Sequence, residues 1–328
     1  MSHNKSLLGR RDFTFGLGAA GLATLVVAPR ARAGAAKKSA FPGIQVGYAA
    51  ITWGDLSSSG SGGARQAVSE ISALGYPGIQ LRAAITKEWK TPDELKADLA
   101  KAKLTFACLS GGGPSADPTK RAAEVEKFVT LVKFAKGAGA LAVQATSPKR
   151  DEKVDKQVEL EAFAETLNAI GKETAALGVP LVFHPHMGQI GQDPADVAVI
   201  MKKTDPKAVK MLLDTGHWAA AGGDPVKAVK EYGKRIVVLH VKDVTDKPAA
   251  PEPGGKETTT PPKKYQFVEL GQGKVDFKGV FNALKAIKFQ GWAIVELDSV
   301  PKDRLPKDAA AANKAFLESL GLVIAPIA

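Results

Sequence analysis

The stretch that decides the fold is Lys210-Met-Leu-Leu-Asp-Thr-Gly-His217. A short apolar run there ends in an acidic residue, followed by a small turn and a histidine. This pattern is typical of a buried strand that delivers Asp214 and His217 to a loop at its end. Three further apolar runs close in the same way, at 181–186 (LVFHPH), 236–243 (IVVLHVKD) and 292–298 (WAIVELD). Four of the chain's five histidines lie in these segments: His184, His186, His217 and His240.

Short apolar runs alternate with longer amphipathic runs along the rest of the chain. The apolar runs predict strands at 44–50, 78–83, 105–110, 141–146, 180–184, 209–214, 236–241 and 293–297. The amphipathic runs predict helices at 64–74, 92–102, 119–137, 158–177, 194–203, 225–234 and 277–287. Capping residues before proline mark four of the helix starts: Thr91, Asp117, Asp193 and Asp224. Glycine follows the helical runs that end at Leu74 and Leu177.

Eight strands separated by helices predict a parallel sheet, and eight such units in about 250 residues predict a single-domain (β/α)₈ TIM barrel. A doubly wound open sheet is the structural alternative. The absence of a G-x-G-x-x-G motif after the first strand weakens that alternative. In a barrel, the carboxyl ends of the strands meet on one catalytic face, so the four histidine- and acid-bearing segments are expected to share one site.

The first 33 residues have the pattern of an export signal. Arg10 and Arg11 precede an apolar run at 16–28, and a small-x-small site closes the segment at Ala33. The paired arginines followed by Phe13 resemble a twin-arginine signal. A transmembrane anchor is the alternative, but the apolar run is shorter than the roughly 20 residues that a spanning helix needs. We therefore expect a periplasmic or extracellular enzyme, with a mature domain at 34–328 that is not inserted in the membrane.

Composition argues against a nucleic-acid partner. The signal carries five basic residues and one acidic residue, so about +7 of the formal net charge of +11 belongs to the mature chain. The lysines are scattered and are not clustered with aromatic residues, which is typical of a solvated surface. A single cysteine, Cys108, excludes an intramolecular disulfide and is expected in the core. A homo-oligomer is compatible with these observations.

One segment departs from a minimal barrel. Residues 246–264 contain five prolines and two glycines, too many for a helix or a central strand. The segment follows the seventh predicted strand on the catalytic face, so it is expected either to cover the substrate or to be a surface insertion.

The four strand ends predict a metal site. Imidazole and carboxylate ligands together suit zinc, manganese, iron or cobalt. Two carboxylates would offset the charge of one divalent ion, which could then polarise a sugar carbonyl. The predicted ligands are His184, Asp214, His240 and Glu296.

Several motifs resemble the xylose isomerase-like TIM-barrel superfamily of sugar isomerases, epimerases and dehydratases. They are FHPHMG at 183–188, LDTGHW at 213–218, AGGDP at 221–225, RI at 235–236, HVKD at 240–243, LGQGKVDF at 270–277 and GWAIVELD at 291–298. The segment QVGYAAITW at 45–53 is also similar to the first strand of inosose dehydratases. The resemblance implies a barrel, a divalent metal and proton abstraction next to a carbonyl. The resemblance also implies that the same four residues are the metal ligands. It implies that His217 contacts substrate hydroxyls and that Trp292 forms a wall of the pocket.

The chain departs from tagatose-type epimerases at the fifth strand. Those enzymes carry a glutamate there, paired with the last-strand glutamate as a two-base system, whereas this chain has His184, with His186 two residues on. A one-sided enolisation with loss of a β-substituent is therefore the better interpretation. A histidine would take the α-proton, and Lys242 or Arg82 would neutralise charge. Because residues at i and i+2 of a strand point the same way, either histidine could be the ligand and the other the base.

Other predicted roles each have a structural alternative. Lys242 is predicted to be catalytic, or else to pair with Asp243. Gln80 and Arg82 are predicted to reach the substrate, or else to serve the barrel core or the surface. Trp53 is predicted to stack on a sugar ring, or else to fill the barrel mouth.

The predicted function is that of an exported, metal-dependent lyase acting on a small carbohydrate such as a keto-sugar, a keto-inositol or a 3-keto-glycoside. The alternatives are a sugar isomerase or epimerase on the same metal site, a hydrolytic metalloenzyme and a non-catalytic sugar-binding barrel. A hydrolytic metal cluster needs more ligands than the clustered histidines readily supply.

Overall fold

The computed structural model describes residues 38–54, 63–247, 264–301 and 303–326. The predicted export signal at 1–33 and most of the proline-rich segment at 246–264 lie outside these ranges. Among the described residues, no helix combines the length and the apolar character that crossing a membrane requires.

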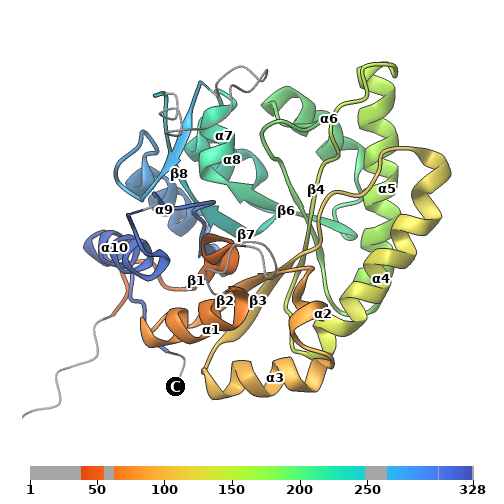
Figure 1. Ribbon diagram of the computed structural model, residues 1–328. Helices are drawn as coiled ribbons and strands as arrows, with labels where there is room; N and C mark the ends of the chain where they lie inside the picture. Colours follow the sequence, from red (N-terminus) through yellow and green to blue (C-terminus); the bar gives the residue numbers. More distant parts are fainter. Residues whose placement is uncertain (1–37, 55–62, 248–263, 302, 327–328) are drawn as a thin grey trace, which may run out of the picture. The chain divides into compact units, whose positions relative to one another are not determined.

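Eight parallel strands close into a barrel in the order β1-β10-β7-β6-β5-β4-β3-β2 (Figure 1). The predicted TIM barrel is therefore confirmed. The barrel strands are β1 (Ile44–Ala49), β2 (Gly78–Arg82), β3 (Thr105–Ser110), β4 (Val143–Thr146), β5 (Leu181–His184), β6 (Val209–Asp214), β7 (Ile236–Val241) and β10 (Gly291–Val295).

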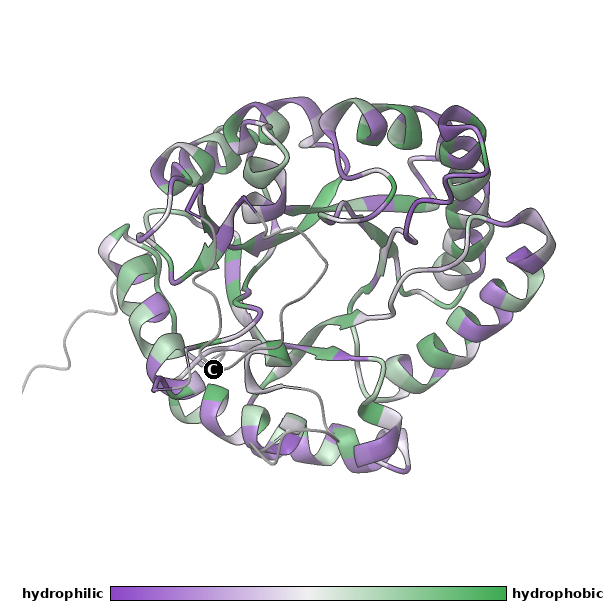
Figure 2. Ribbon diagram, turned by 45° about the horizontal axis from the view of Figure 1, so that its top comes forward, coloured by the Kyte–Doolittle hydropathy of each residue, from purple (hydrophilic) through white to green (hydrophobic). Residues whose placement is uncertain are grey.

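Helices surround this barrel, and their hydrophilic residues alternate with the hydrophobic ones that pack inward (Figure 2). They are α1 (Gly63–Ala73), α2 (Ile85–Glu88), α3 (Pro92–Lys101), α4 (Arg121–Gly137), α5 (Lys156–Ala176), α6 (Pro194–Lys203), α7 (Thr215–Ala220), α8 (Pro225–Tyr232), α9 (Phe277–Ala286) and α10 (Pro306–Ser319). Two 3₁₀ turns, η1 (Ala50–Trp53) and η2 (Pro118–Lys120), complete the described helical structure.

The local signals for helix ends operate mostly as predicted. The Thr91 side chain accepts a hydrogen bond from the Glu94 amide, and Asp224 caps α8 in the same way. Asp117 caps a 3₁₀ turn rather than an α-helix, and Asp193 makes no capping hydrogen bond through its side chain.

The barrel has two hydrophobic layers, and the two-residue period of the strands separates them. The larger layer lies between the strands and the helices. The smaller one, which includes Cys108, Val182, Leu212 and Ile294, consists of residues on the inner face of the barrel. Cys108 is a buried free thiol, as predicted. On the inner face of the barrel, these apolar residues come first along the strands, and polar residues follow them at the carboxyl ends.

Besides η1 and α2, two further elements near the mouth were not predicted. A two-stranded antiparallel hairpin, β8 (Asp243–Thr245) with β9 (Gln266–Val268), flanks the proline-rich segment. The other is α7, whose first turn carries His217. The C-terminal helix α10 was also missed.

Candidate active site

Four strand ends bring the predicted metal ligands to one level of the barrel. Asp214 and His240 are register partners at the ends of β6 and β7, and His184 ends β5. Glu296 follows the last residue of β10. All four residues are at most 6% exposed.

The ligand atoms of this group converge. Nδ1 of His240 lies 3.2 Å from Oε2 of Glu296 and 3.4 Å from Oδ2 of Asp214. Nε2 of His184 lies 3.5 Å from the same Asp214 oxygen. The other Asp214 oxygen accepts from the His217 amide at the start of α7, which fixes the orientation of the carboxylate.

Three of these four atoms have no hydrogen-bond partner among the described residues: His184 Nε2, Asp214 Oδ2 and His240 Nδ1. Buried polar atoms without partners are rare and costly, so a convergent set of them needs an explanation. Two imidazole nitrogens and two carboxylate oxygens are a suitable donor set for a divalent transition metal. The residues therefore fit the predicted divalent metal ion.

Burial and the buried ammonium of Lys242 set the protonation states in the site. Burial lowers the pKa of His184 to about 4, so this imidazole is neutral. Burial raises the pKa of the two carboxyl groups, but the neighbouring histidines and Lys242 outweigh it. The pKa of Asp214 is therefore well below its ordinary value, and that of Glu296 is about 2.

His186 and His217 stack beside the ligand group, with ring centroids 3.9 Å apart. Nδ1 of His186 donates to the Met187 carbonyl, so the neutral ring has its lone pair on Nε2. Nδ1 of His217 accepts from the Met187 amide, so the neutral ring carries its hydrogen on Nε2. Burial is the largest cause that lowers the pKa of both rings. The two histidines thus differ: one is an acceptor at Nε2 and the other a donor.

Lys242 is fully buried beneath the mouth. Its Nζ donates to Glu296 at 2.9 Å and to Asp298 at 2.6 Å, and it lies over the Phe267 ring of β9 at 4.4 Å. Burial lowers the pKa of Lys242, but the two carboxylates outweigh it and hold the pKa above its ordinary value. The alternative ion pair with Asp243 is wrong, because that carboxylate instead accepts four backbone N–H groups.

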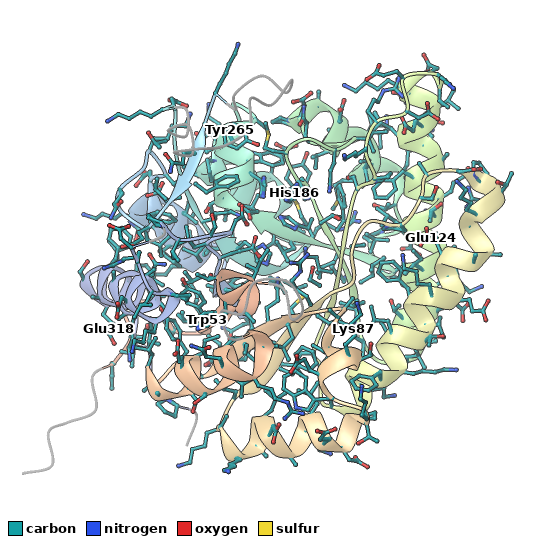
Figure 3. All side chains as sticks on the ribbon, in the orientation of Figure 1. Trp53, Lys87, Glu124, His186, Tyr265 and Glu318 are labelled. Atoms are coloured by element: carbon teal, nitrogen blue, oxygen red, sulfur yellow. The ribbon has the colours of Figure 1, made fainter. Side chains whose placement is uncertain are left out.

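A cavity of about 190 Å³ opens over His184 and Glu296. His186, which also lines it, lies inside the ring of helices (Figure 3). Gln80 and Arg82 from β2 line the cavity, and their contact with a substrate stays a prediction. The other lining residues are Ala49, Ile51, Ser110, Gly112, Gln144, Thr146, His184, His186, Gln189, Glu296 and Asp298.

The structure places the two predicted tryptophans elsewhere. The Trp53 ring is buried in the layer between strands and helices, and its indole N–H donates to Glu70 at 2.7 Å. Trp292 belongs to the inner cluster of the barrel, four residues before Glu296 on the same strand face, at the opposite end from the site. Neither lines the cavity.

Five polar residues that line the cavity were not predicted: Ser110, Gln144, Thr146, Gln189 and Asp298. Gln144 and Thr146 sit at i and i+2 on β4, the same spacing that drew attention to Gln80 and Arg82. The sequence signal for Gln144 was therefore present. Asp298 also stands at i+2 from Glu296, whereas Gln189 lies beyond the strand and carries no such signal.

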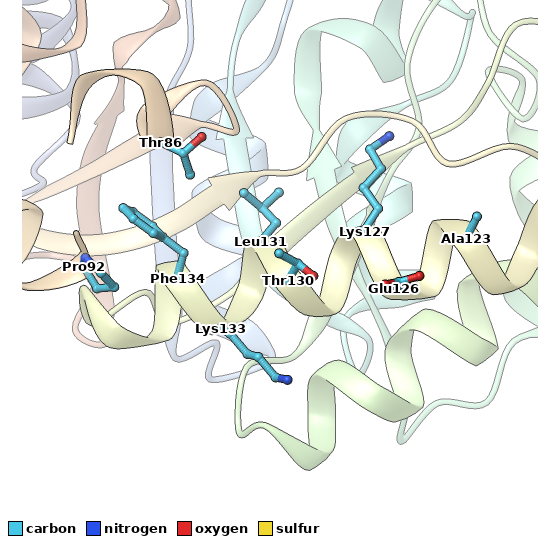
Figure 4. A pocket seen from close by; sticks show the side chains of 9 residues that line it. All are labelled: Thr86, Pro92, Ala123, Glu126, Lys127, Thr130, Leu131, Lys133 and Phe134. Atoms are coloured by element: carbon cyan, nitrogen blue, oxygen red, sulfur yellow. The ribbon is translucent and has the colours of Figure 1, made fainter. Parts of the chain in front are cut away.

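A larger hollow of about 780 Å³ lies on the outer surface along α4 (Figure 4). Its walls include Phe134, Leu131 and Lys127 of α4, with Thr86 and Pro92 opposite. It contains neither a histidine nor a convergent set of polar groups. The smaller cavity at the carboxyl ends of the strands is therefore the candidate active site.

A closed parallel barrel with histidines and carboxylates converging at its carboxyl mouth defines a class of barrel enzymes. Residues 68–320 match the xylose isomerase-like TIM barrel family, and the chain belongs to this family. The predicted resemblance is thereby confirmed at the family level, and the chain is an enzyme.

Known proteins extend this assignment. The chain is 30% identical over 268 residues to the inosose dehydratase of Lacticaseibacillus casei, covering 77% of this chain and 88% of that protein. The IolI protein, solved with a zinc atom, aligns with a TM-score of 0.65 at 19% identity, over 84% of this chain and 97% of that one. D-psicose 3-epimerase from Clostridium cellulolyticum H10, solved with D-tagatose, aligns with a TM-score of 0.66 at 15% identity, over 85% and 100% of the two chains. The two structural similarities support the fold.

Proposed function

We propose that this enzyme is a divalent-metal-dependent dehydratase of a keto-inositol or a related keto-sugar. The proposal joins two lines of support. The relative with 30% identity is an inosose dehydratase, and the cavity holds a ligand set for one metal ion beside a histidine with a free lone pair. The observation that carries the proposal is the difference between His184 and His186.

His184 is suited to be a metal ligand and His186 to be a base. Nε2 of His184 is buried and directed at the Asp214 carboxylate, within the convergent group. His186 is only half-buried and lines the cavity, and its hydrogen is committed to the Met187 carbonyl. Its Nε2 lone pair is therefore available for a proton from the substrate. A lowered pKa keeps this ring neutral near pH 7.

The reaction balances with His186 as the single proton carrier. Nε2 takes the proton from the carbon next to the substrate carbonyl. The same proton then passes to the hydroxyl on the neighbouring carbon, which departs as water while a C=C bond forms. A divalent ion bound by His184, Asp214, His240 and Glu296 would polarise the carbonyl and acidify the adjacent C–H bond.

Two further groups hold charge in place. The ammonium of Lys242 is fixed by Glu296 and Asp298, so it stabilises negative charge that develops on the substrate without losing its own proton. Nε2 of His217 lies 3.5 Å from Nζ of Lys242, so this buried ring belongs to the group around the ammonium. Arg82 at the end of β2 lines the same cavity and supplies a second positive charge.

A sugar isomerase or epimerase on the same metal site is the second candidate. The alignment with D-psicose 3-epimerase favours the same barrel for both chemistries. We further propose that the enzyme is exported, on the strength of Arg10, Arg11 and the apolar run that follows them. N-terminal sequencing of protein from fractionated cells would test export directly.

The function is tested by measuring metal content and then incubating the enzyme with an inosose. We expect one divalent ion per chain, and a product with a new C=C bond and one water fewer than the substrate. A saturated product with an inverted or shifted centre would replace the dehydratase with the isomerase. A chain that binds no divalent metal would refute the proposed site.

A further inference from the structure

Two buried glutamines connect the two ligand histidines. Gln80 of β2 and Gln144 of β4 are 4% and 3% exposed. Nε2 of His240 lies 2.9 Å from Oε1 of Gln80. Nε2 of Gln80 lies 3.2 Å from Oε1 of Gln144, whose own Nε2 lies 2.7 Å from Nδ1 of His184. The four side chains form one continuous relay around the metal group.

The direction of this relay decides which nitrogen of each histidine is free. His240 donates to Gln80, Gln80 donates to Gln144, and Gln144 donates to Nδ1 of His184. A neutral imidazole carries one hydrogen, so His240 keeps a free lone pair on Nδ1, as a ligand requires. His184 instead keeps its hydrogen on Nε2, the atom directed at Asp214. In this direction only one of the two histidines is ready to bind a metal.

We propose that Gln144 is a positioning residue that controls the tautomer of His184, and that its amide together with that of Gln80 recognises a substrate oxygen. The inference rests on the proposed metal site. A half-turn of the Gln144 amide places Oε1 against Nδ1 of His184. That nitrogen then donates, and Nε2 becomes a free ligand atom.

The same half-turn creates a binding site for an acceptor. It brings the NH₂ group of Gln144 against the NH₂ group of Gln80, and neither can accept from the other. Both side chains line the cavity, and Gln80 is already oriented by His240 and lies 3.5 Å from Oε2 of Glu296. A carbonyl or hydroxyl oxygen of the substrate between the two NH₂ groups satisfies both donors.

Two variants separate the roles of the amide. Gln144→Leu removes both the donor and the acceptor, so His184 loses the partner that fixes its tautomer. Gln144→Glu offers an oxygen to His184 and another to Gln80, which removes the conflict between donors but also removes one N–H from the substrate site. Gln189 lines the same cavity without a hydrogen bond to either ligand histidine among the described contacts, so Gln189→Leu and Gln189→Glu are matched controls.

The first readout is the Kd for Zn²⁺, measured by calorimetry on metal-free protein, with circular dichroism to verify folding. We expect Gln144→Leu to weaken Zn²⁺ binding by roughly 10–100-fold, and Gln144→Glu to bind at least as tightly as the parent enzyme. Both Gln189 variants should stay within about threefold of the parent, given the usual scatter for residues that do not touch the ligands. The second readout is the KM for inosose with saturating Zn²⁺, which Gln144→Glu should raise by roughly 2–10-fold.

The results distinguish this inference from the proposed function. If the parent binds Zn²⁺ but both Gln144 variants weaken binding equally, or neither does, the tautomer control is overturned while the metal site stands. An unchanged KM in Gln144→Glu overturns the recognition of a substrate oxygen. A parent enzyme that binds no Zn²⁺ overturns the metal site and this inference together.

Discussion

Asp243→Asn should destabilise the enzyme strongly, although the residue touches neither the proposed metal ligands nor the cavity. The Asp243 side chain is 1% exposed, and its two oxygens accept four backbone N–H groups. Oδ1 accepts from Val244 at 2.9 Å and from Val275 at 3.1 Å, and Oδ2 accepts from Gly271 and Gly273 at 2.9 Å each. This carboxylate fastens the loop before α9 to the hairpin strand β8, next to Lys242.

The size of the effect follows from these four bonds. Asparagine keeps one acceptor oxygen and turns its NH₂ group toward two N–H donors, so two charge-assisted hydrogen bonds are lost. Each is worth about 1.5–3 kcal/mol, which predicts a loss of about 3–6 kcal/mol. In a domain of this size, that corresponds to a fall in Tm of roughly 6–12 °C.

The assay is thermal and urea unfolding of the parent and of two variants. Asp246→Asn is the matched control, because Asp246 joins the same two segments through an exposed ion pair with Lys274 at 2.5 Å. Exposed pairs contribute little, so this variant should stay within about 1 kcal/mol of the parent. A Tm of Asp243→Asn within about 1 °C of the Tm of the parent would contradict this role of the four hydrogen bonds. An equal loss of stability in Asp243→Asn and Asp246→Asn would contradict it too.

Three further predictions concern the site and the barrel interior. His186→Asn should lower kcat/KM for inosose by roughly 10²–10⁴-fold while leaving the Kd for Zn²⁺ unchanged. In the parent enzyme, kcat/KM should fall as the pH drops through a midpoint below 6.5, because burial and Lys242 lower the pKa of His186. Weakened metal binding in His186→Asn would reverse the assignment of His184 and His186. Asp214→Asn should abolish the rise in Tm on adding Zn²⁺. In the parent, Zn²⁺ at 1,000 times its Kd should add about 4 kcal/mol to the free energy of unfolding. An undiminished rise in Tm in the variant would place the ion elsewhere. Gly78→Ala should cost about 1–3 kcal/mol, since its Cβ would lie 2.2 Å from the Trp292 ring, and Trp292→Leu in the same chain should recover part of that loss; a destabilisation unrelated to residue 292 would contradict the packing.

The sequence predicted the barrel, and it predicted that His184, Asp214, His240 and Glu296 meet at its mouth, for one physical reason. In a parallel barrel, the carboxyl ends of all strands share a face, so a polar residue that closes an apolar run is already placed in space. This rule alone places Asp214, His240 and Glu296 together at the mouth. The period of two also placed Gln144 on the inner face of β4, and attention to that spacing would have found it.

The position of a residue along its strand explains why the predicted role of Trp292 failed. The inner face of β10 carries Trp292, Ile294 and Glu296 in turn, so residue type and facing alone do not separate a pocket wall from the floor of the barrel. Trp53 failed differently, because a turn of 3₁₀ helix carries its ring outward to Glu70. The choice between His184 and His186 also required coordinates, since only the contact with the Met187 carbonyl shows which lone pair is free.

The number of bases at the cavity favours elimination over epimerisation. Epimerisation removes a proton from one face of a carbon and returns one to the other, so it needs proton carriers on both faces. His184 ends the fifth strand, and Nε2 of this histidine is directed at Asp214. The last-strand Glu296 is held by Lys242 through one oxygen and directs the other at His240. Among the described histidines that line the cavity, His186 has a lone pair outside the convergent ligand group, and one base that first takes and then gives back a proton is sufficient for loss of water.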